Sequence, residues 1–341
     1  MKTIKVAVNG FGRIGRAFFK LAWERPEIEI TVVNDLGSLE SLAYLLQYDT
    51  VYRKWNHTVT HDGNGLIIDG KPVKFISEKD TTKLPWKDLE IDVVVESTGL
   101  FAAYDKSEFH ITQGAKHVVI TAPAHDVEDE GVKGETILVG VNEDKFGVCP
   151  ITSNASCTTN AASPLIAILH DTIGIEKALL STTHGYTATQ ALVDGPSKKD
   201  LREGRAAAQN IVPSSTGAAI AVTEAFTDLK GLFDGISLRV PVPAGSIVDV
   251  TFIAKKNVTA EEVNKVLKDA AASEHWKNIF AVTEEPLVSS DILGETHASV
   301  ADLAMTRVVG GNLVKVLAWY DNEMGYTHTL VEHVIKAGQN Q

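Results

Sequence analysis

The first apolar positions along the chain predict a strand, a helix and a second strand. The run from Ile4 to Asn9 is short and rich in β-branched residues, which is typical of a buried strand. The segment RAFFKLAWERPE has apolar residues at helical spacing and stops near Pro26. A second β-branched run covers Ile28 to Val33, so the chain opens with the pattern of a β-α-β unit.

Further apolar runs extend this parallel sheet. Strands are expected at Ile91–Glu96, His117–Thr121 and Thr136–Val141. Thr98 and Gly99 come just after the first of these strands, and Thr121 closes the second. Ligands bind outside the carboxyl ends of the strands of an open parallel sheet, so these three residues are candidate cofactor contacts. The alternative is that they form ordinary turns.

A glycine motif lies between the first strand and its helix. Gly10, Gly12 and Gly15 occur in G-x-G-x-x-G register, which allows a tight turn, a backbone close to a pyrophosphate, and close packing of helix and strand. Asp35 follows the second strand, where a carboxylate can bind a ribose 2′-OH and repel a 2′-phosphate. The pattern predicts a dinucleotide-binding unit that prefers NAD to NADP. A glycine turn that merely packs tightly and a solvated aspartate are the alternatives.

The second half of the chain is dominated by consecutive strand patterns. Strand patterns occur in KALLSTTH, DGISLRVPV, SIVDVTFIA and NLVKVLAWY, and a helix is expected at Ala260–Ala272. This order indicates a mixed or antiparallel sheet with helices on one face. A last helix is expected at about Met324–Ala337. We therefore expect an α/β fold with a Rossmann-type doubly wound parallel sheet and an α+β catalytic domain with a mixed or antiparallel sheet.

Composition and charge narrow the class of protein. The chain has 341 residues, of which 44% are hydrophobic and 22% charged, enough for two domains. A net charge of −12 argues against nucleic acid or an anionic membrane as the main partner, although a local positive site can still bind a small anion. No apolar run approaches the roughly 20 residues of a membrane span. With two cysteines and no signal-peptide pattern, we expect a cytoplasmic enzyme.

The segment SNASCTTN places Cys157 among hydroxyl and amide side chains. The apolar stretch after it predicts a helix to about Gly174, with Cys157 in the first turn, where free N–H groups and the helix dipole favour a thiolate. A structural cysteine usually lies in apolar surroundings, so this one is a candidate nucleophile. His184, between an apolar strand and a Gly-containing loop, is the candidate base. Surface or packing positions are expected for His57, His61, His110, His125, His275, His297 and His328.

Six motifs together resemble the glyceraldehyde-3-phosphate dehydrogenase family. They are NGFGRIGR, SNASCTTN, HGYTATQ, NIVPSSTGAA, LRVPVPAGSIVDV and WYDNEMGY, in the family's order. The resemblance implies that Cys157 is the nucleophile and His184 its base, with no metal. It implies the conversion of D-glyceraldehyde 3-phosphate to 1,3-bisphosphoglycerate with NAD and inorganic phosphate, through a thiohemiacetal and a thioester. It also implies a homotetramer, an NAD-binding domain of residues 1–156 and 323–341, and a catalytic domain of residues 157–322.

The resemblance also assigns binding roles. The inorganic phosphate would be held by Ser156, Thr158, Thr216 and Gly217, and the C3 phosphate of the substrate by Thr187 and Arg239. NAD would be contacted by Arg13, Ile14, Asp35, Lys79, Thr121 and Asn322. Thr216 and Gly217 open an Ala-rich helical stretch, whose N-terminus suits an anion. The planar guanidinium of Arg239 suits a phosphate, although an arginine on a strand is more commonly part of a surface salt bridge.

The sequence departs from the family at two positions and leaves two other functions open. Ala161 stands where many relatives carry a second cysteine, and Glu203 follows Arg202 where some bacterial relatives have adjacent arginines. The role of Arg202 is therefore open. Erythrose-4-phosphate dehydrogenase, which shares the nucleophile and base, is one alternative. A binding or redox-sensing protein on the same scaffold is the other. A cysteine hydrolase would leave the dinucleotide-binding unit without a purpose.

Overall fold

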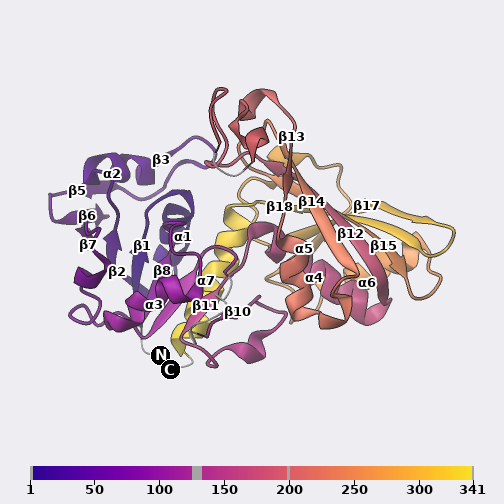
Figure 1. Ribbon diagram of the computed structural model, residues 1–341, viewed down its shortest axis with the longest axis horizontal. Helices are drawn as coiled ribbons and strands as arrows, with labels where there is room; N and C mark the ends of the chain where they lie inside the picture. The colour runs from indigo at the N-terminus through magenta and orange to yellow at the C-terminus, as the bar shows by residue number, and fades with distance from the viewer. Residues whose placement is uncertain (1–2, 125–132, 198–199, 340–341) are drawn as a thin grey trace. The chain divides into compact units, whose positions relative to one another are not determined.

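The computed structural model describes residues 3–124, 133–197 and 200–339. The chain divides into two compact units, one of Met1–Ala155 with Thr327–Gln341 and the other of Ser156–Tyr326. The colour ramp of Figure 1 follows the chain through the first unit, into the second, and back to the first along the final helix. The sequence predicts that one domain ends at residue 156 and the next at residue 322. These limits stay a prediction about which segments fold as separate domains.

Within the described ranges, the first unit is built on a nine-stranded sheet with the order β10-β11-β9-β8-β1-β2-β7-β6-β5. Its strands are β1 (Ile4–Asn9), β2 (Ile28–Asn34), β5 (Val59–His61), β6 (Gly65–Ile68), β7 (Lys71–Ile76), β8 (Val93–Glu96), β9 (His117–Ile120), β10 (Glu135–Thr136) and β11 (Ile151–Ser153). The strands from β10 to β7 all pair in parallel, which confirms the expected parallel sheet. The carboxyl ends of β1, β2 and β8 therefore lie next to one another.

The helices of the first unit follow from short sequence signals. They are α1 (Arg13–Trp23), α2 (Leu39–Gln47), α3 (Tyr104–Thr112) and α7 (Met324–Gln339), with 3-10 turns η1 (Thr81–Lys83) and η2 (Glu143–Lys145) and a small ribbon of β3 (Tyr48–Asp49) and β4 (Arg53–Lys54). In α1, Phe18 and Phe19 are fully buried, as the helical spacing predicts. His333 of α7 contacts Thr152 of β11 at 2.8 Å, which ties the end of the chain to this sheet.

The expected strand at Thr136–Val141 is wrong beyond its first residue. Strand β10 ends at Thr136, and the chain then turns. The side chain of Asn142 causes the turn, because its Oδ1 accepts a hydrogen bond from Leu138 N at 2.7 Å and its Nδ2 donates one to Thr136 O at 2.9 Å. Gly140 has a φ of 81°, a left-handed conformation that glycine adopts without strain. The apolar run TILVGV is buried as a turn rather than as a strand.

The second unit contains a seven-stranded mixed sheet with the order β13-β14-β12-β15-β18-β17-β16. Its strands are β12 (Ile175–Gly185), β13 (Val212–Ser215), β14 (Phe233–Val240), β15 (Ser246–Ala254), β16 (Phe280–Thr283), β17 (Ser299–Val309) and β18 (Leu313–Tyr320). Its helices are α4 (Cys157–Thr172), α5 (Ala218–Ala225) and α6 (Ala260–Ala271), with 3-10 turns η3 (Leu201–Gly204), η4 (Ala207–Gln209), η5 (Thr227–Leu229) and η6 (Ser289–Ile292). The pairs β12·β14 and β16·β17 are parallel and the others antiparallel, which confirms the expected mixed sheet.

One face of the seven-stranded sheet forms the core of this unit. Along β15, buried and half-buried residues alternate without exception, as the sequence pattern predicts. The buried face packs against α4, α5 and α6, through residues such as Leu165, Val222 and Leu267. The opposite face carries partly exposed apolar side chains, among them Leu179 and Ile236. Among the described residues, no helix combines the length and apolar character that a membrane crossing requires.

Candidate active site

Helix α4 begins at Cys157, as the sequence predicts. Ser156 caps the helix, because its hydroxyl accepts a hydrogen bond from Thr159 N at 3.0 Å. The side chain of Asn160 donates to Ser156 O at 3.0 Å and fixes the capping residue from the other side. The polar residues around the cysteine thus build the helix start, and they hold Cys157 at its first position.

The structure brings Cys157 and His184 together. The sulfur lies 3.3 Å from Nε2 of His184, within hydrogen-bond distance for sulfur. His184 is near the end of β12 and only 2% exposed, whereas Cys157 is half-buried. A cysteine sulfur within hydrogen-bond distance of a buried imidazole is the arrangement of a nucleophile with its base.

Arg239 completes a row of three side chains. It lies opposite His184 in the parallel register of β14 and β12. Its guanidinium NH1 is 2.6 Å from Nδ1 of His184, and Nδ1 is also 2.6 Å from the carbonyl oxygen of Gly185. The sequence assigns Arg239 to a phosphate, but the structure also places its charge directly against the candidate base.

Burial and Arg239 together control the charge of this site. Burial, and then the positive charge of Arg239, lower the pKa of His184 to about 3, so the imidazole is neutral at neutral pH. Burial raises the pKa of the Cys157 thiol, while Arg239 and hydrogen bonds from Thr158 act in the opposite direction. Burial therefore opposes the thiolate that is expected at the helix start, whereas Arg239 and Thr158 favour it, and the thiolate stays a prediction.

Tyr320 is a further residue of this site that the sequence did not single out. Its hydroxyl contacts Thr158 Oγ1 at 2.9 Å and Thr182 Oγ1 at 2.8 Å, and its ring packs edge-on against His184 at 5.9 Å between centroids. Tyr320 is 1% exposed, and its position in the alternating pattern of β18 points it into the core. A buried tyrosine needs a partner for its hydroxyl, which is the signal that could have identified it.

The residues predicted to bind phosphate all lie in the second unit, but their side chains differ in burial and in hydrogen-bond partners. Thr158 is buried against Tyr320, and Ser156 is engaged in capping. Thr187 contacts Thr189 at 3.0 Å in the loop after β12. Thr216 and Gly217 lie directly before α5, which confirms the predicted helix start. Gly217 is exposed and is the N-cap of α5, and the N–H of Ala218, the first residue of the helix, donates to Thr216 Oγ1 at 3.2 Å.

The glycine motif has the geometry that a dinucleotide needs. Gly10 has a φ of 93°, and a Cβ there would lie 2.5 Å from Thr98 N. A Cβ on Gly15 would lie 2.2 Å from Gly10 O, so the packing of α1 against the loop requires glycine. At Gly12 a Cβ would meet nothing within 4 Å, and no side chain caps α1. The open approach at Gly12 and the uncapped helix fit a pyrophosphate.

Asp35 is fixed at the end of β2. Its carboxylate accepts hydrogen bonds from Phe11 N at 2.6 Å and Gly37 N at 2.7 Å. Phe11 lies between the first two glycines of the motif, so the carboxylate is held directly beside the glycine loop. This placement suits a contact with a ribose hydroxyl and disfavours a 2′-phosphate.

The other predicted cofactor contacts stay predictions about roles. Thr98, Gly99 and Thr121 follow the ends of β8 and β9, as expected, and Ile14 lies in the first turn of α1. The side chain of Arg13 pairs with Asp49 at 3.0 Å, and Lys79 is exposed in the loop after β7. Asn322 belongs to the second unit, where its Oδ1 accepts hydrogen bonds from Gly245 N and Ser246 Oγ, both at 3.0 Å. These bonds fix the orientation of its amide.

The described residues contain no cluster of His, Cys, Asp or Glu that could hold a metal ion. In the loop of residues 194–210, Lys198 and Lys199 lie outside the described residues. Arg202 pairs with Asp200 at 2.7 Å, and Glu203 accepts a hydrogen bond from Ser214 at 3.3 Å.

Comparison with known proteins gives consistent matches over both units. Residues 4–104 match the family model for the glyceraldehyde 3-phosphate dehydrogenase NAD binding domain, and residues 156–322 match the model for the C-terminal domain of the same family. Glyceraldehyde-3-phosphate dehydrogenase 2 of Streptomyces avermitilis is 46% identical over 98% of this chain and 99% of its own length. Glyceraldehyde-3-phosphate dehydrogenase 1 of Bacillus subtilis is 46% identical over 96% of both chains. The Thermotoga maritima glyceraldehyde-3-phosphate dehydrogenase is 47% identical over 96% of this chain and 97% of its own.

Proposed function

The chain belongs to the glyceraldehyde 3-phosphate dehydrogenase family, and from this premise we propose that it oxidises D-glyceraldehyde 3-phosphate with NAD and joins the product to inorganic phosphate. The product is 1,3-bisphosphoglycerate. The observation that carries the proposal is the row formed by Cys157, His184 and Arg239, with a sulfur–nitrogen distance of 3.3 Å and a guanidinium–imidazole distance of 2.6 Å. It joins a nucleophile, a base and an anion-binding group in one unit.

The Cys157 sulfur attacks the aldehyde carbon and forms a carbon–sulfur bond. His184 is neutral, so it can accept the proton that the thiol gives up and pass it to the aldehyde oxygen, which becomes the hydroxyl of the thiohemiacetal. It can then accept that hydroxyl proton when the hydride leaves. NAD, when bound, supplies the hydride acceptor for this oxidation. The thioester that remains is attacked by phosphate, which displaces the Cys157 sulfur and releases the acyl phosphate. The oxyanions formed on the way would be stabilised by Cys157 N–H and by the His184 imidazolium.

Two phosphate groups need separate binding residues. We place the C3 phosphate of the substrate on Arg239 and Thr187, because Arg239 lies beside the base and offers a planar fork of donors. Inorganic phosphate would bind at the N-terminal ends of α4 and α5, with Ser156, Thr158 and the exposed N-cap formed by Gly217. Thr216 precedes this cap and belongs to the same site.

The glycine loop and Asp35 would hold NAD in the first unit. Gly12 gives open access to the uncapped start of α1, and Asp35 is fixed beside the loop, so the residues present fit this cofactor. Thr98, Gly99 and Thr121 would contribute walls of the same site. Asn322, in the second unit, would bind the nicotinamide carboxamide through its oriented amide.

We also propose a homotetramer in the cytoplasm. The outer face of the seven-stranded sheet exposes Leu179 by 66% and Ile236 by 54%, on neighbouring strands and on the same side. An exposed apolar sheet face of this kind favours burial against another copy. Among the described residues, neither Cys149 nor Cys157 forms a disulfide, which is consistent with a reducing compartment.

The test is NADH formation followed by absorbance. Glyceraldehyde 3-phosphate with NAD and phosphate should give NADH, and Cys157→Ser should abolish it. Replacing phosphate by arsenate should keep turnover, NADP should support little, and erythrose 4-phosphate should be the poorer substrate. Faster turnover of erythrose 4-phosphate would assign the sister activity. Unchanged NADH formation by Cys157→Ser would remove the proposed mechanism.

A further inference from the structure

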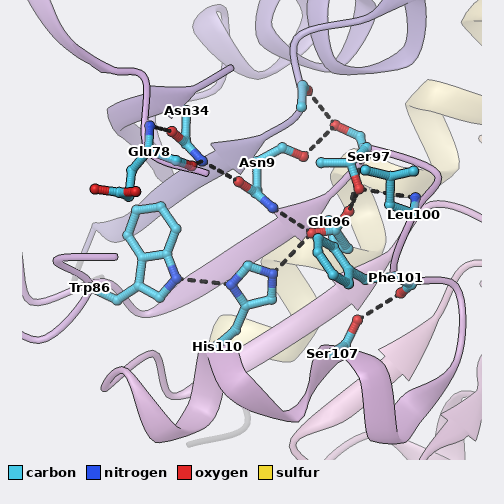
Figure 2. A network of polar contacts seen from close by, with 12 residues as sticks. Asn9, Asn34, Glu78, Trp86, Glu96, Ser97, Leu100, Phe101, Ser107 and His110 are labelled. Atoms are coloured by element: carbon cyan, nitrogen blue, oxygen red, sulfur yellow. Dashed lines mark hydrogen bonds and ion pairs between the residues drawn. The ribbon is translucent and has the colours of Figure 1, made fainter. Parts of the chain in front are cut away.

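A network of buried polar side chains joins the carboxyl ends of three neighbouring strands of the first unit (Figure 2). Asn9, Asn34 and Glu96 are the last residues of β1, β2 and β8, and the sheet register pairs Asn9 with each of the other two. Asn34 Nδ2 donates to Asn9 Oδ1 at 2.8 Å, and Asn9 Nδ2 donates to Glu96 Oε2 at 2.6 Å. The exposed fractions of the three residues are 6% or less, so the network is shielded from water.

The Glu96 carboxylate is the centre of this network. Its Oε2 also accepts from His110 Nε2 at 2.9 Å, and its Oε1 accepts from Thr98 N at 2.9 Å and from the Thr98 hydroxyl. A buried carboxylate is stable when its oxygens are fully hydrogen-bonded. Four donors reach Glu96 from three different segments of the chain, and each is a neutral group if His110 is neutral.

The protonation of His110 follows from its other partner. Trp86 Nε1 lies 2.9 Å from His110 Nδ1, and an indole N–H can only donate. Nδ1 must therefore be an acceptor, which leaves the proton on Nε2, where it is donated to Glu96. Ser107, on the same helix α3, donates to Phe101 O at 2.8 Å, so the helix also holds the loop after β8.

Each strand-end member of the network stands next to a residue that we assign to the cofactor. Asn9 precedes Gly10, Asn34 precedes Asp35, and Glu96 binds both the N–H and the hydroxyl of Thr98. Beyond the strands, Asn34 also fixes Glu78, accepting from its N–H at 2.9 Å and donating to its carbonyl oxygen at 3.1 Å, and Glu78 precedes Lys79. Glu96 O further accepts from Thr121 N at 3.0 Å. A displacement of the Glu96 carboxylate would therefore disturb several cofactor loops at once.

We propose that Glu96 is a positioning residue for NAD, which aligns the glycine loop, the Asp35 turn and the Thr98 loop through Asn9, Asn34 and Thr98. The inference rests on the proposed function, since it concerns the same cofactor site. Glu96 acts through its neighbours. His110, on α3, donates its Nε2 proton to Glu96, and the hydrogen bond from Trp86 to Nδ1 fixes the proton on Nε2.

The test compares two buried carboxylates at opposite ends of one strand. Glu96→Gln keeps the shape of the side chain but turns one oxygen into an NH2 group, so two of the four donors meet a donor. Asp92→Asn is the matched control, because Asp92 is 2% exposed, binds Lys5 N at 3.0 Å and Lys116 Nζ at 2.7 Å, and lies just before the other end of β8. We expect NAD binding by titration calorimetry to weaken about ten- to a hundredfold in Glu96→Gln and by less than about twofold in Asp92→Asn.

A second pair of variants keeps the test open if Glu96→Gln does not fold. His110→Leu removes the anchoring donor at a position remote from the cofactor residues in sequence, and His110→Gln can restore it while still accepting from Trp86. We expect the NAD dissociation constant to rise several-fold in the leucine variant and to return toward that of the wild type in the glutamine variant. Alkylation of Cys157 without NAD should be unchanged in all variants, because Cys157 belongs to the other unit.

The outcomes separate the inference from the proposed function. Failure of the wild-type protein to bind NAD would remove the proposed function. The positioning role alone would be overturned if the wild type binds NAD and the two variants, Glu96→Gln and Asp92→Asn, lose NAD affinity equally or not at all. Equal NAD affinities of the leucine and glutamine variants of His110 would also overturn it.

Discussion

Arg239 gives the sharpest prediction of the structure, because one charge acts on both the proposed nucleophile and the proposed base. Its NH1 lies 2.6 Å from His184 Nδ1, and its charge lowers the pKa of His184 and that of Cys157. Arg239→Gln removes the charge and leaves a shorter side chain with a neutral amide. Both pKa values should therefore rise. The imidazole should stay neutral at about pH 7, since burial, the larger cause of its low pKa, persists.

The magnitude follows from the spacing of the three side chains. The imidazole ring separates the guanidinium from the sulfur, which puts the charge roughly 8 Å from Cys157 and makes its attraction for a thiolate about 2 kcal/mol at an effective dielectric constant of about 20. Arg239 is half-buried, so solvent screening reduces this to about 1 kcal/mol. At neutral pH the variant should hold about fivefold less thiolate than the wild type.

The assay is the rate of alkylation of Cys157 by iodoacetamide, a neutral reagent that does not need the phosphate site. The rate at about pH 7 should fall about fivefold in Arg239→Gln, and the rise of the rate with pH should shift to higher pH. Arg205→Gln is the control, because Arg205 pairs with Asp194 on the surface of the same unit. A rate in Arg239→Gln equal to or above that of the wild type would refute the electrostatic reasoning.

Three further predictions concern the base, its support and a buried histidine. His184→Asn should lower kcat/KM for glyceraldehyde 3-phosphate by about 10²- to 10⁴-fold, and a loss below tenfold in NADH formation would contradict its role as base. Tyr320→Phe leaves Thr158 and Thr182 without their shared partner, so urea unfolding should show a loss of about 1–3 kcal/mol together with a lower kcat, whereas an effect on KM alone would count against it. Burial lowers the pKa of His333 to about 3. Below about pH 6.5 the unfolded chain therefore binds a proton at this residue that the folded protein does not bind. As the pH is lowered through this range, the free energy of unfolding should decrease by up to about 1.4 kcal/mol per pH unit because of this group. In His333→Gln the urea midpoint should depend less steeply on pH over that range, and an identical slope would exclude the contribution.

Local sequence patterns were sufficient to predict the elements whose limits depend only on residues close together in the chain. The limits of β1 and the start of α4 follow from β-branched runs and from a serine cap, both of which act over a few residues. The prediction of a strand at Thr136–Val141 was wrong because of another local interaction. Its apolar residues are buried, but the Asn142 side chain bonds back to the backbone and competes with strand pairing. Burial alone does not distinguish a strand from a turn.

The residue types of the site were predictable, but their contacts were not. The sequence predicted roles for Cys157, His184 and Arg239. The contact of Arg239 with the imidazole, however, depends on the parallel register of β12 and β14, which are separated in the chain by a long loop and α5. The pKa of Cys157 depends on burial by residues from several strands, which no local pattern reports. Glu96 ended a predicted strand without any signal that His110 would supply its donor.

In the proposed mechanism, the two short contacts of His184 Nδ1 would connect substrate recognition to catalysis. Nδ1 lies 2.6 Å from Gly185 O, which can only accept, and 2.6 Å from Arg239 NH1, which can only donate, so one nitrogen cannot satisfy both. With a proton on Nδ1, the bond to Gly185 forms and Nε2 is free to take a proton from the Cys157 side. Without it, Nδ1 accepts from Arg239 and the proton sits on Nε2. A substrate phosphate that draws the guanidinium to itself removes the competing donor, so we expect phosphate binding to favour the tautomer in which His184 acts as a base toward Cys157.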